Sequence, residues 1–167
     1  MREYVTDALV LRVNLEGERN KRAVLYTEAL GKISVRVASG TSIKSRLSQH
    51  LNPGFLTTAR FVEKKDRFTL TDILSKSQKS IPSLRVLLAA SLVLPIGIPD
   101  PDMWSFLASS EKSGMSEFLG HAGYNASRAE CVLCQEKRIA FFATKDHEFF
   151  CKHCGSQFPR GEVIYLG

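Results

Sequence analysis

Four cysteines near the end of the chain are the residues whose types and spacing point most directly to chemistry. They form two Cys-x-x-Cys pairs, Cys131 with Cys134 and Cys151 with Cys154, and the chain has no other cysteine. Each Cys-x-x-Cys turn directs two thiolates at one metal ion, and two such turns complete the tetrahedral set that zinc prefers. The spacing therefore predicts one structural zinc ion per chain. Four thiolate ligands leave no open coordination position, so a catalytic zinc is not expected.

Other uses of the paired cysteines are degenerate metal binding, redox sensing or an iron–sulfur cluster. A catalytic dithiol needs only one Cys-x-x-Cys, at a helix start in a thioredoxin-like sheet, and the surrounding pattern lacks that context. Residues 138–143 and 148–150 are expected to form a hairpin that brings the two pairs together. Gly155 suits the backbone turn of a zinc knuckle. His147 is an alternative ligand, and His153 is expected to point outward.

The N-terminal part of the chain has the pattern of a small β-barrel. A tight turn is expected over 28–31, a basic turn over 63–67, and a short helix over 45–51. Five short strands with a helical insert between the third and the fourth predict an OB-fold barrel, and an SH3-like barrel also fits the strand count. The strands are expected at 8–13, 22–27, 32–37, 55–62 and 68–74.

The middle of the chain changes in character and favours helices. They are expected over 84–94, over 103–109 with Asp102 as the N-cap, and over 116–122. The overall prediction is an α+β protein with a five-stranded OB-fold barrel, a short helical region and a C-terminal four-cysteine zinc element. Its domains are an OB-fold nucleic-acid-binding domain and a short helical domain with a zinc ribbon at 131–155, with expected bounds of 1–78 and 79–167.

Positive charge is concentrated in the barrel. The chain carries a formal net charge of +6, and residues 1–80 alone carry a net +7. Such a surplus favours a polyanionic partner, although a basic, solvated surface is the alternative interpretation. Lys32 and Arg36 are expected on one face of a strand, opposite Ile33, Val35 and Val37. The full set of candidate nucleic-acid contacts is Lys32, Arg36, Lys44, Arg46, Arg19, Lys21, Arg22, Lys64, Lys65 and Arg67.

Several function classes lack support in the sequence. No phosphate-binding P-loop, nucleophile elbow or His-Glu-x-x-His motif occurs, and the four histidines are scattered, so an enzyme is not expected. The longest apolar stretch, residues 84–98, contains Arg85 and Pro95 and is too short to span a bilayer. The charged N-terminus lacks an apolar signal core. We therefore expect a cytoplasmic protein without a membrane partner.

Several short motifs, taken in order, resemble the RecO family of bacterial DNA repair and recombination mediators. The N-terminal resemblance is followed by a helix that leads into the first cysteine pair, and together the motifs cover most of the chain. They are Gly17-Glu18, Thr27-Glu28, Gly31-Lys32, the run from Val35 to Gly40, Lys44 to Leu47, Phe118 to Tyr124, and Cys131 to Cys134.

The resemblance implies a non-catalytic protein with an N-terminal OB-fold, a helical domain and a four-cysteine zinc element. It implies binding to single- and double-stranded DNA, annealing of complementary strands, and action with RecR to help RecA load on single-stranded DNA. Single-stranded-DNA-binding protein and RecF are further implied partners, and the implied location is the cytoplasm, in association with the nucleoid. A different OB-fold plus zinc-ribbon module, RNA-binding or ribosome-associated, is the alternative function.

Overall fold

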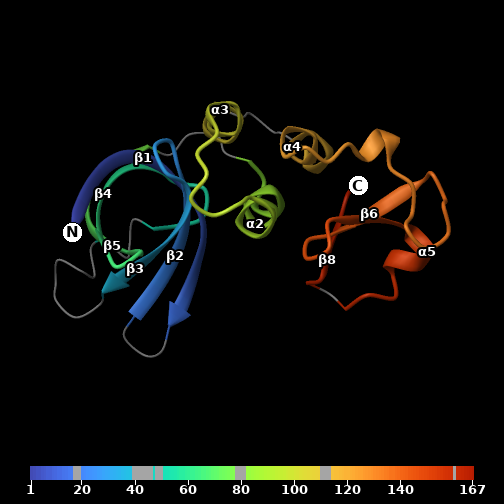
Figure 1. The fold of residues 1–167 in the computed structure, drawn as a ribbon, viewed down its shortest axis with the longest axis horizontal. Helices are drawn as coiled ribbons and strands as arrows, with labels where there is room; N and C mark the ends of the chain where they lie inside the picture. The colour runs from blue at the N-terminus through green and yellow to red at the C-terminus, as the bar shows by residue number, and fades with distance from the viewer. Residues whose placement is uncertain (17–19, 39–46, 48–50, 78–81, 110–113, 160) are drawn as a thin grey trace. The chain divides into compact units, whose positions relative to one another are not determined.

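A computed structural model describes residues 1–16, 20–38, 47, 51–77, 82–109, 114–159 and 161–167 (Figure 1). Its contacts divide the chain into two compact units, Met1–Lys112 and Ser113–Gly167. This division differs from the expected boundary after residue 78. Helices α2 (Leu84–Val93) and α3 (Pro101–Ser109) fall in the same unit as the N-terminal strands, because their side chains and backbone contact β-strands of that unit.

The first unit is built around a five-stranded sheet. The strands pair in the order β1-β2-β3-β5-β4, and β4 pairs again with β1, so the sheet closes into a barrel. All pairs are antiparallel except β3 with β5, which pair in parallel at two positions only. The five predicted strands are confirmed, and the first is longer than expected. Their bounds are β1 Arg2–Glu16, β2 Asn20–Thr27, β3 Gly31–Ala38, β4 Leu56–Lys64 and β5 Arg67–Ser77.

Alternation along the strands separates the barrel core from the outer face. On β3, Ile33, Val35 and Val37 are at most 2% exposed and belong to the core cluster, whereas Arg36 lies on the opposite face and is exposed. This arrangement confirms the predicted alternation. Leu47 and Leu51 also lie in the core cluster, but the rest of the helix predicted over 45–51 lies outside the described residues.

The turn before β3 depends on a glycine. Gly31 has a φ of +66°, in the left-handed region, and a Cβ there would collide with the backbone carbonyl of Ile98. An L side chain would meet both the backbone strain and the collision. The close approach lets residues 96–97 join the edge of β3, through a parallel bridge at Lys32 and a hydrogen bond from the Gly97 N–H to the Lys32 carbonyl.

Two helices complete the first unit. Helix α2 is not buried all round as its composition suggests, because Leu84, Leu88 and Leu92 are exposed. Helix α3 starts two residues earlier than predicted, and its cap is Asp100 rather than Asp102. The Asp100 carboxylate accepts hydrogen bonds from the N–H groups of residues 102 and 103. Pro101 takes the first helical position, where its missing N–H costs nothing.

The second unit contains a short helix and a three-stranded sheet. Helix α4 (Met115–His121) matches the helix predicted over 116–122, and a 3₁₀ turn, η1 (Ala126–Arg128), follows it. The predicted hairpin is confirmed as β6 (Ile139–Ala143) and β7 (Glu148–Cys151), and the sheet order is β7-β6-β8. The sequence pattern missed strand β8 (Val163–Tyr165). Helix α5 (Lys152–Gly155) follows β7 directly.

Within the described ranges, no helix is both long and apolar enough to cross a bilayer.

Candidate functional site

The four cysteines of the second unit converge on one point. Their Sγ atoms all lie within 4.8 Å of one another, and three of the four residues are buried. The Sγ of Cys134 lies 3.6 Å from that of Cys151 and 3.7 Å from that of Cys154. These separations are far too long for a disulfide, whose S–S bond is about 2.05 Å.

The same separations fit a tetrahedral metal site. Ligands about 2.3 Å from a central zinc ion would lie about 3.8 Å apart at tetrahedral angles. The two short Sγ–Sγ distances, 3.6 and 3.7 Å, are close to that value. The donor set and its spacing therefore fit a metal ion bound by four thiolates.

Local backbone geometry holds the cysteines in place. Cys131 lies before a turn in which Gln135 adopts a φ of 61° and donates its N–H to the Cys131 carbonyl. Cys151 ends β7 and caps α5, where its Sγ accepts the N–H of Cys154. The space beside Gly155 is filled, because a Cβ there would collide with the ring of Phe141. Its role in the backbone turn of the knuckle stays a prediction.

The surroundings of the thiols shift their pKa values in opposite directions. Burial disfavours ionisation of Cys131, but backbone N–H groups of Cys151, Cys134 and Leu133 outweigh it and lower the pKa of Cys131 to about 6. Burial and the neighbouring thiols raise the pKa of Cys154 to about 12. Each ionised thiol makes the ionisation of its neighbours less favourable. All four cysteines can therefore ionise together only when a cation lies at the centre of the cluster.

Neither nearby histidine belongs to this cluster. The ring of His147 forms a 2.8 Å hydrogen bond with the Tyr124 hydroxyl and stacks on Phe142. His153 is exposed, as expected. Among the described residues, the four cysteines are the one group whose ligand atoms gather closely enough to hold a metal ion.

A second candidate site lies on the barrel, at the place where β3 and β5 part. These strands pair at Val35 and Arg36, whereas Lys32 at the other end of β3 pairs with Ile96 instead. Between these pairings a cavity of about 850 Å³ opens. All five strands and residues 96–97 contribute to its lining, which is Tyr4, Arg22, Leu30, Ile33, Ser34, Arg36, Glu63, Asp66, Arg67, Phe68, Thr69, Ile96 and Gly97.

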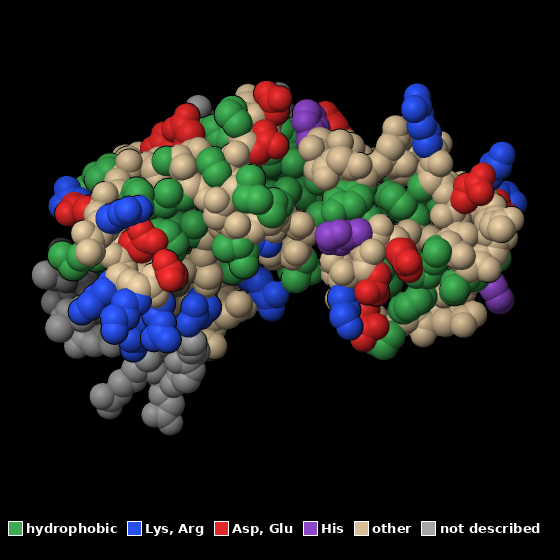
Figure 2. Space-filling model, viewed as in Figure 1, with side chains coloured by type: hydrophobic (Ala, Val, Ile, Leu, Met, Phe, Trp, Pro, Cys, Tyr) green, Lys and Arg blue, Asp and Glu red, His purple; other side chains and the backbone are tan. Residues whose placement is uncertain are grey.

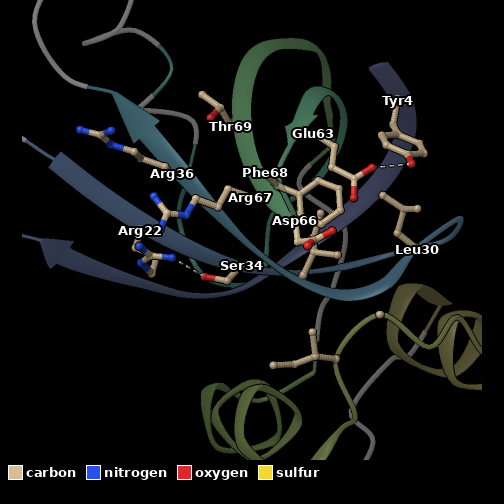
Figure 3. Close-up of a pocket in the computed structure, with 13 residues that line it drawn as sticks. Tyr4, Arg22, Leu30, Ser34, Arg36, Glu63, Asp66, Arg67, Phe68 and Thr69 are labelled. Carbon is tan, nitrogen blue, oxygen red and sulfur yellow. Dashed lines mark hydrogen bonds between the residues drawn. The ribbon is translucent and has the colours of Figure 1, made fainter. Parts of the chain in front are cut away.

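Three arginines stand together on one side of this cavity. Arg22 and Arg36 are directly opposite each other on the antiparallel strands β2 and β3, and Arg67 begins β5 beside them (Figure 3). Figure 2 shows Lys and Arg side chains gathered at this end of the barrel, with Asp and Glu side chains next to them. Like charges placed directly across a strand pair destabilise a sheet. A bound anion would offset that repulsion.

Lys32 does not join the arginines, in contrast to the prediction. It lies on the outer face of β3 as expected, but it is only 7% exposed, and its Nζ donates a 3.0 Å hydrogen bond to the Ser91 carbonyl in the last turn of α2. Burial lowers the pKa of Lys32. Strand alternation gave the correct face, but α2 covers it. In this arrangement the ammonium group stabilises a helix C-terminus rather than meeting solvent.

The other predicted contacts are dispersed. Lys21 is opposite Val37 on the inward side of the sheet and is only partly exposed. Lys64 and Lys65 are exposed at the β4–β5 turn, outside the cavity lining. Arg19, Lys44 and Arg46 lie outside the described residues.

The aromatic and acidic residues of the cavity were missed by the sequence reasoning. Tyr4 and Phe68 form a ring pair with centroids 6.1 Å apart, and the Tyr4 hydroxyl donates a 2.9 Å hydrogen bond to Glu63. Tyr26 and Phe61, two other aromatic residues of the barrel strands, are both buried. A usable signal was the position of Phe68, which directly follows the basic turn.

Comparisons with known proteins point to one family. The family model described as "Recombination protein O N terminal" matches residues 1–77. The chain is 27% identical over 183 residues to "DNA repair protein RecO" of Bacillus pumilus, an alignment that covers 92% of this chain and 69% of that protein. It is 26% identical over 182 residues to the protein of the same name from Bacillus velezensis, with the same coverage.

Proposed function

We propose that this chain is a member of the RecO family and a non-catalytic DNA-binding and strand-annealing factor in recombinational DNA repair. A role in DNA repair and recombination is the part that the family itself supports. The observation that carries the DNA-binding part is the group of three arginines at one side of the barrel cavity. In this proposal the strands within residues 1–78 bind nucleic acid, and residues 79–167 supply the helices and the zinc-containing element.

The barrel topology supports an OB-fold assignment. The closed strand order β1-β2-β3-β5-β4, with the chain crossing between β3 and β4, is the arrangement of a five-stranded Greek-key barrel. OB-folds bind oligonucleotides on the face of the second and third strands, between the β1–β2 and β4–β5 loops. Arg22 on β2, Arg36 on β3 and Arg67 after the β4–β5 turn occupy this face.

Arginine suits phosphate recognition for a physical reason. Its planar guanidinium offers a fork of donors to phosphate oxygens and stays charged at any physiological pH. Arg36 and Arg67 form no ion pair with a carboxylate among the described residues. Their charge is therefore available to a polyanion, and binding releases counterions from the DNA.

The second unit supports the proposal as a metal-stabilised element. One zinc ion would cross-link the two Cys-x-x-Cys turns. Its ligands would be Cys131, Cys134, Cys151 and Cys154. Since four thiolates saturate the ion, the site would stabilise structure rather than perform chemistry. Neither site in this proposal requires a catalytic group.

Partners follow from the family resemblance. We propose that the chain acts with a RecR-like protein to help RecA load on single-stranded DNA, with single-stranded-DNA-binding protein and RecF as further partners. Both DNA forms are proposed ligands, membranes are not, and the proposed location is the cytoplasm in association with the nucleoid.

The experiment that tests the proposal measures binding and annealing on the same protein. Fluorescence anisotropy with single-stranded DNA, duplex DNA and RNA of matched length, across a salt series, gives affinities and salt slopes. A strand-annealing assay with complementary oligonucleotides measures the activity. Clearly tighter binding to RNA, with no annealing of DNA, would instead favour the RNA-binding alternative.

A paired substitution locates the binding face. Arg36→Ala with Arg67→Ala should weaken binding to single-stranded DNA by about tenfold or more and reduce the log–log salt slope by about 1.4, since each lost phosphate contact contributes about 0.7. The matched control is Lys137→Ala with Lys145→Ala, which removes two exposed charges from the second unit. Wild-type affinity and slope in the arginine variant would place DNA binding elsewhere.

A further inference from the structure

The side of the cavity away from the arginines is not explained by phosphate binding. It is lined by Tyr4, Phe68 and Leu30, which are partly buried and pack against the barrel core, and by the carboxylates of Glu63 and Asp66 (Figure 3). Carboxylates repel phosphate, so a site for phosphate alone would not include them. The cavity therefore has a cationic side and an aromatic, acidic side.

No ion pair joins Glu63 or Asp66 to Arg36 or Arg67 among the described residues, although all four line the same cavity. Glu63 is oriented by the Tyr4 hydroxyl, which donates a 2.9 Å hydrogen bond to its Oε2. A carboxylate has about four acceptor positions, so most of those on Glu63 stay available to a ligand.

A nucleotide has the matching division of chemistry. Its phosphate is an anion, and its base offers a flat face for stacking on aromatic rings and an edge for hydrogen bonds. A volume of about 850 Å³ accommodates one nucleotide and lies within the usual range of small-molecule sites. Tyr4 and Phe68, whose ring planes are inclined by 56°, provide the aromatic surface.

A carboxylate discriminates among the four bases. The Watson–Crick edge of guanine carries two adjacent donors, N1–H and N2–H, which one carboxylate can accept together. Adenine and cytosine place a ring acceptor beside their amino group, and thymine places carbonyl oxygens on both sides of its single N–H. A carboxylate facing any of these three bases meets at least one repulsive lone pair.

We infer that the cavity between β3 and β5 binds one unstacked guanine nucleotide of a single DNA strand. The inference rests on the proposed DNA-binding function and deepens it. The base lies against Tyr4 and Phe68, its Watson–Crick edge meets Glu63, and the adjoining phosphate meets Arg36 and Arg67. Asp66 lines the same side and adds negative potential near the donors. Since a guanine paired with cytosine has no free Watson–Crick edge, the base position takes single-stranded DNA only, and duplex DNA would meet the arginines without it.

The test compares thirteen-nucleotide strands that differ at one central position. The strands are oligo-dT with a central guanine, hypoxanthine or thymine, and their affinities are measured by anisotropy at one salt concentration. Wild-type protein should bind the guanine strand about tenfold more tightly than the thymine strand, as expected for a two-donor contact. The hypoxanthine strand, which lacks the N2 amino group, should lose most of this preference.

Variants connect the preference to the residues. Glu63→Gln should abolish the guanine preference, because an amide turns one acceptor into a donor, while leaving the affinity for the thymine strand within about twofold. Tyr4→Phe, which removes the group that orients Glu63, should reduce the preference and keep the ring. Glu28→Gln is the matched control, because Glu28 is an exposed carboxylate outside the cavity lining. Thermal melting of each variant checks that it folds.

The outcomes separate this inference from the proposed function. Equal affinity of wild-type protein for the guanine and thymine strands, with binding still sensitive to Arg36 and Arg67, overturns the guanine site and leaves DNA binding intact. Absence of binding to every strand overturns both. Free dGMP is also added as a competitor of the guanine strand. If dGMP displaces the strand at an equal concentration, the cavity binds a free nucleotide, and its assignment to a DNA strand is overturned.

Discussion

The barrel cavity and the cysteine cluster reach their geometry by different routes. The four cysteines lie on two tight turns joined by one hairpin, so local spacing brings the ligands together. The cavity draws its lining from all five strands and from residues 96–97, so it exists only when the whole barrel has closed. The stability of the cluster should therefore depend on the proposed metal ion, and that of the cavity on backbone fit within the barrel unit.

Loss of the proposed zinc ion should have the largest effect on the molecule. Cys151→Ser should abolish zinc binding and unfold the second unit, because metal binding contributes about 10–16 kcal/mol in small zinc elements and exceeds the stability of such a unit. The barrel should keep its amide-exchange protection. Elemental analysis and hydrogen exchange measure the two effects.

His153→Ala is the matched control for that experiment. It changes an exposed residue between two ligands and should retain one zinc per chain. A barrel that unfolds together with the second unit in Cys151→Ser would contradict the independence of the two regions, and a fully folded second unit without metal would contradict the role of zinc.

Gly31→Ala should produce the largest effect within the barrel. The new Cβ would collide with the Ile98 carbonyl and would force an L side chain into a φ of +66°. Backbone atoms cannot rotate away, so we expect a loss of about 3 kcal/mol or more in the free energy of unfolding. Urea denaturation followed by tryptophan fluorescence reports on this unit, because Trp104 stacks on Tyr26. A loss below about 1 kcal/mol would show that residues 96–98 do not need this close approach.

Gly155→Ala should have a smaller effect, confined to the second unit. Its Cβ would collide with the Phe141 ring, a side chain that has some freedom to shift. We expect a cost of about 1–3 kcal/mol, read as faster amide exchange in this unit at fixed zinc concentration. Adding Phe141→Leu should recover part of the loss by making room. If the double variant is no better than the single one, the collision is not the cause.

Lys32→Met should have the smallest effect at neutral pH. An apolar side chain of similar length removes the desolvation cost of the buried ammonium group and loses its hydrogen bond to the Ser91 carbonyl. Such replacements are commonly neutral or mildly stabilising, so we expect a change within about 1 kcal/mol. DNA affinity should also stay within about twofold, since Lys32 is not accessible. A tenfold loss of affinity with the fold intact would restore Lys32 as a DNA contact.

The same variant should change how stability depends on pH. Burial lowers the pKa of Lys32 below 10.5, so between the folded-state pKa and 10.5 the unfolded chain binds more protons than the folded one. The free energy of unfolding of the wild type should therefore increase as pH rises from the folded-state pKa of Lys32 to 10.5. This contribution is lost again as pH falls back through the folded-state pKa. Burial raises the pKa of Tyr26, which is opposite Lys32 on β2. This second shift lowers the free energy of unfolding as pH rises, but only near pH 10 and above. Urea denaturation of wild type and Lys32→Met between pH 7 and 9.5 isolates the Lys32 contribution as their difference.

Local pattern was sufficient for much of the molecule. The Cys-x-x-Cys spacing identified the four clustered thiols, and the alternation of Ile33, Val35 and Val37 identified the inward face of β3. Both depend on residues a few positions apart, for which backbone geometry alone decides direction. The helix N-cap at Asp100 was missed by two residues, because several capping residues stand near the start of α3.

Only the tertiary structure decided what the outer face of β3 meets. Strand alternation put Lys32 and Arg36 on the same face, but α2 buries Lys32 against Ser91, while Arg36 stays exposed beside Arg22. Likewise, Tyr4 and Glu63 meet across 59 positions of the chain, and no periodic pattern connects them. By itself, the amino-acid sequence determined the strands, the cysteine cluster and the basic character of the barrel, because these arise from side-chain type and short-range geometry. Closure of the barrel and the docking of α2 decided which charges reach solvent and which residues share a cavity, because burial depends on segments far apart in the chain.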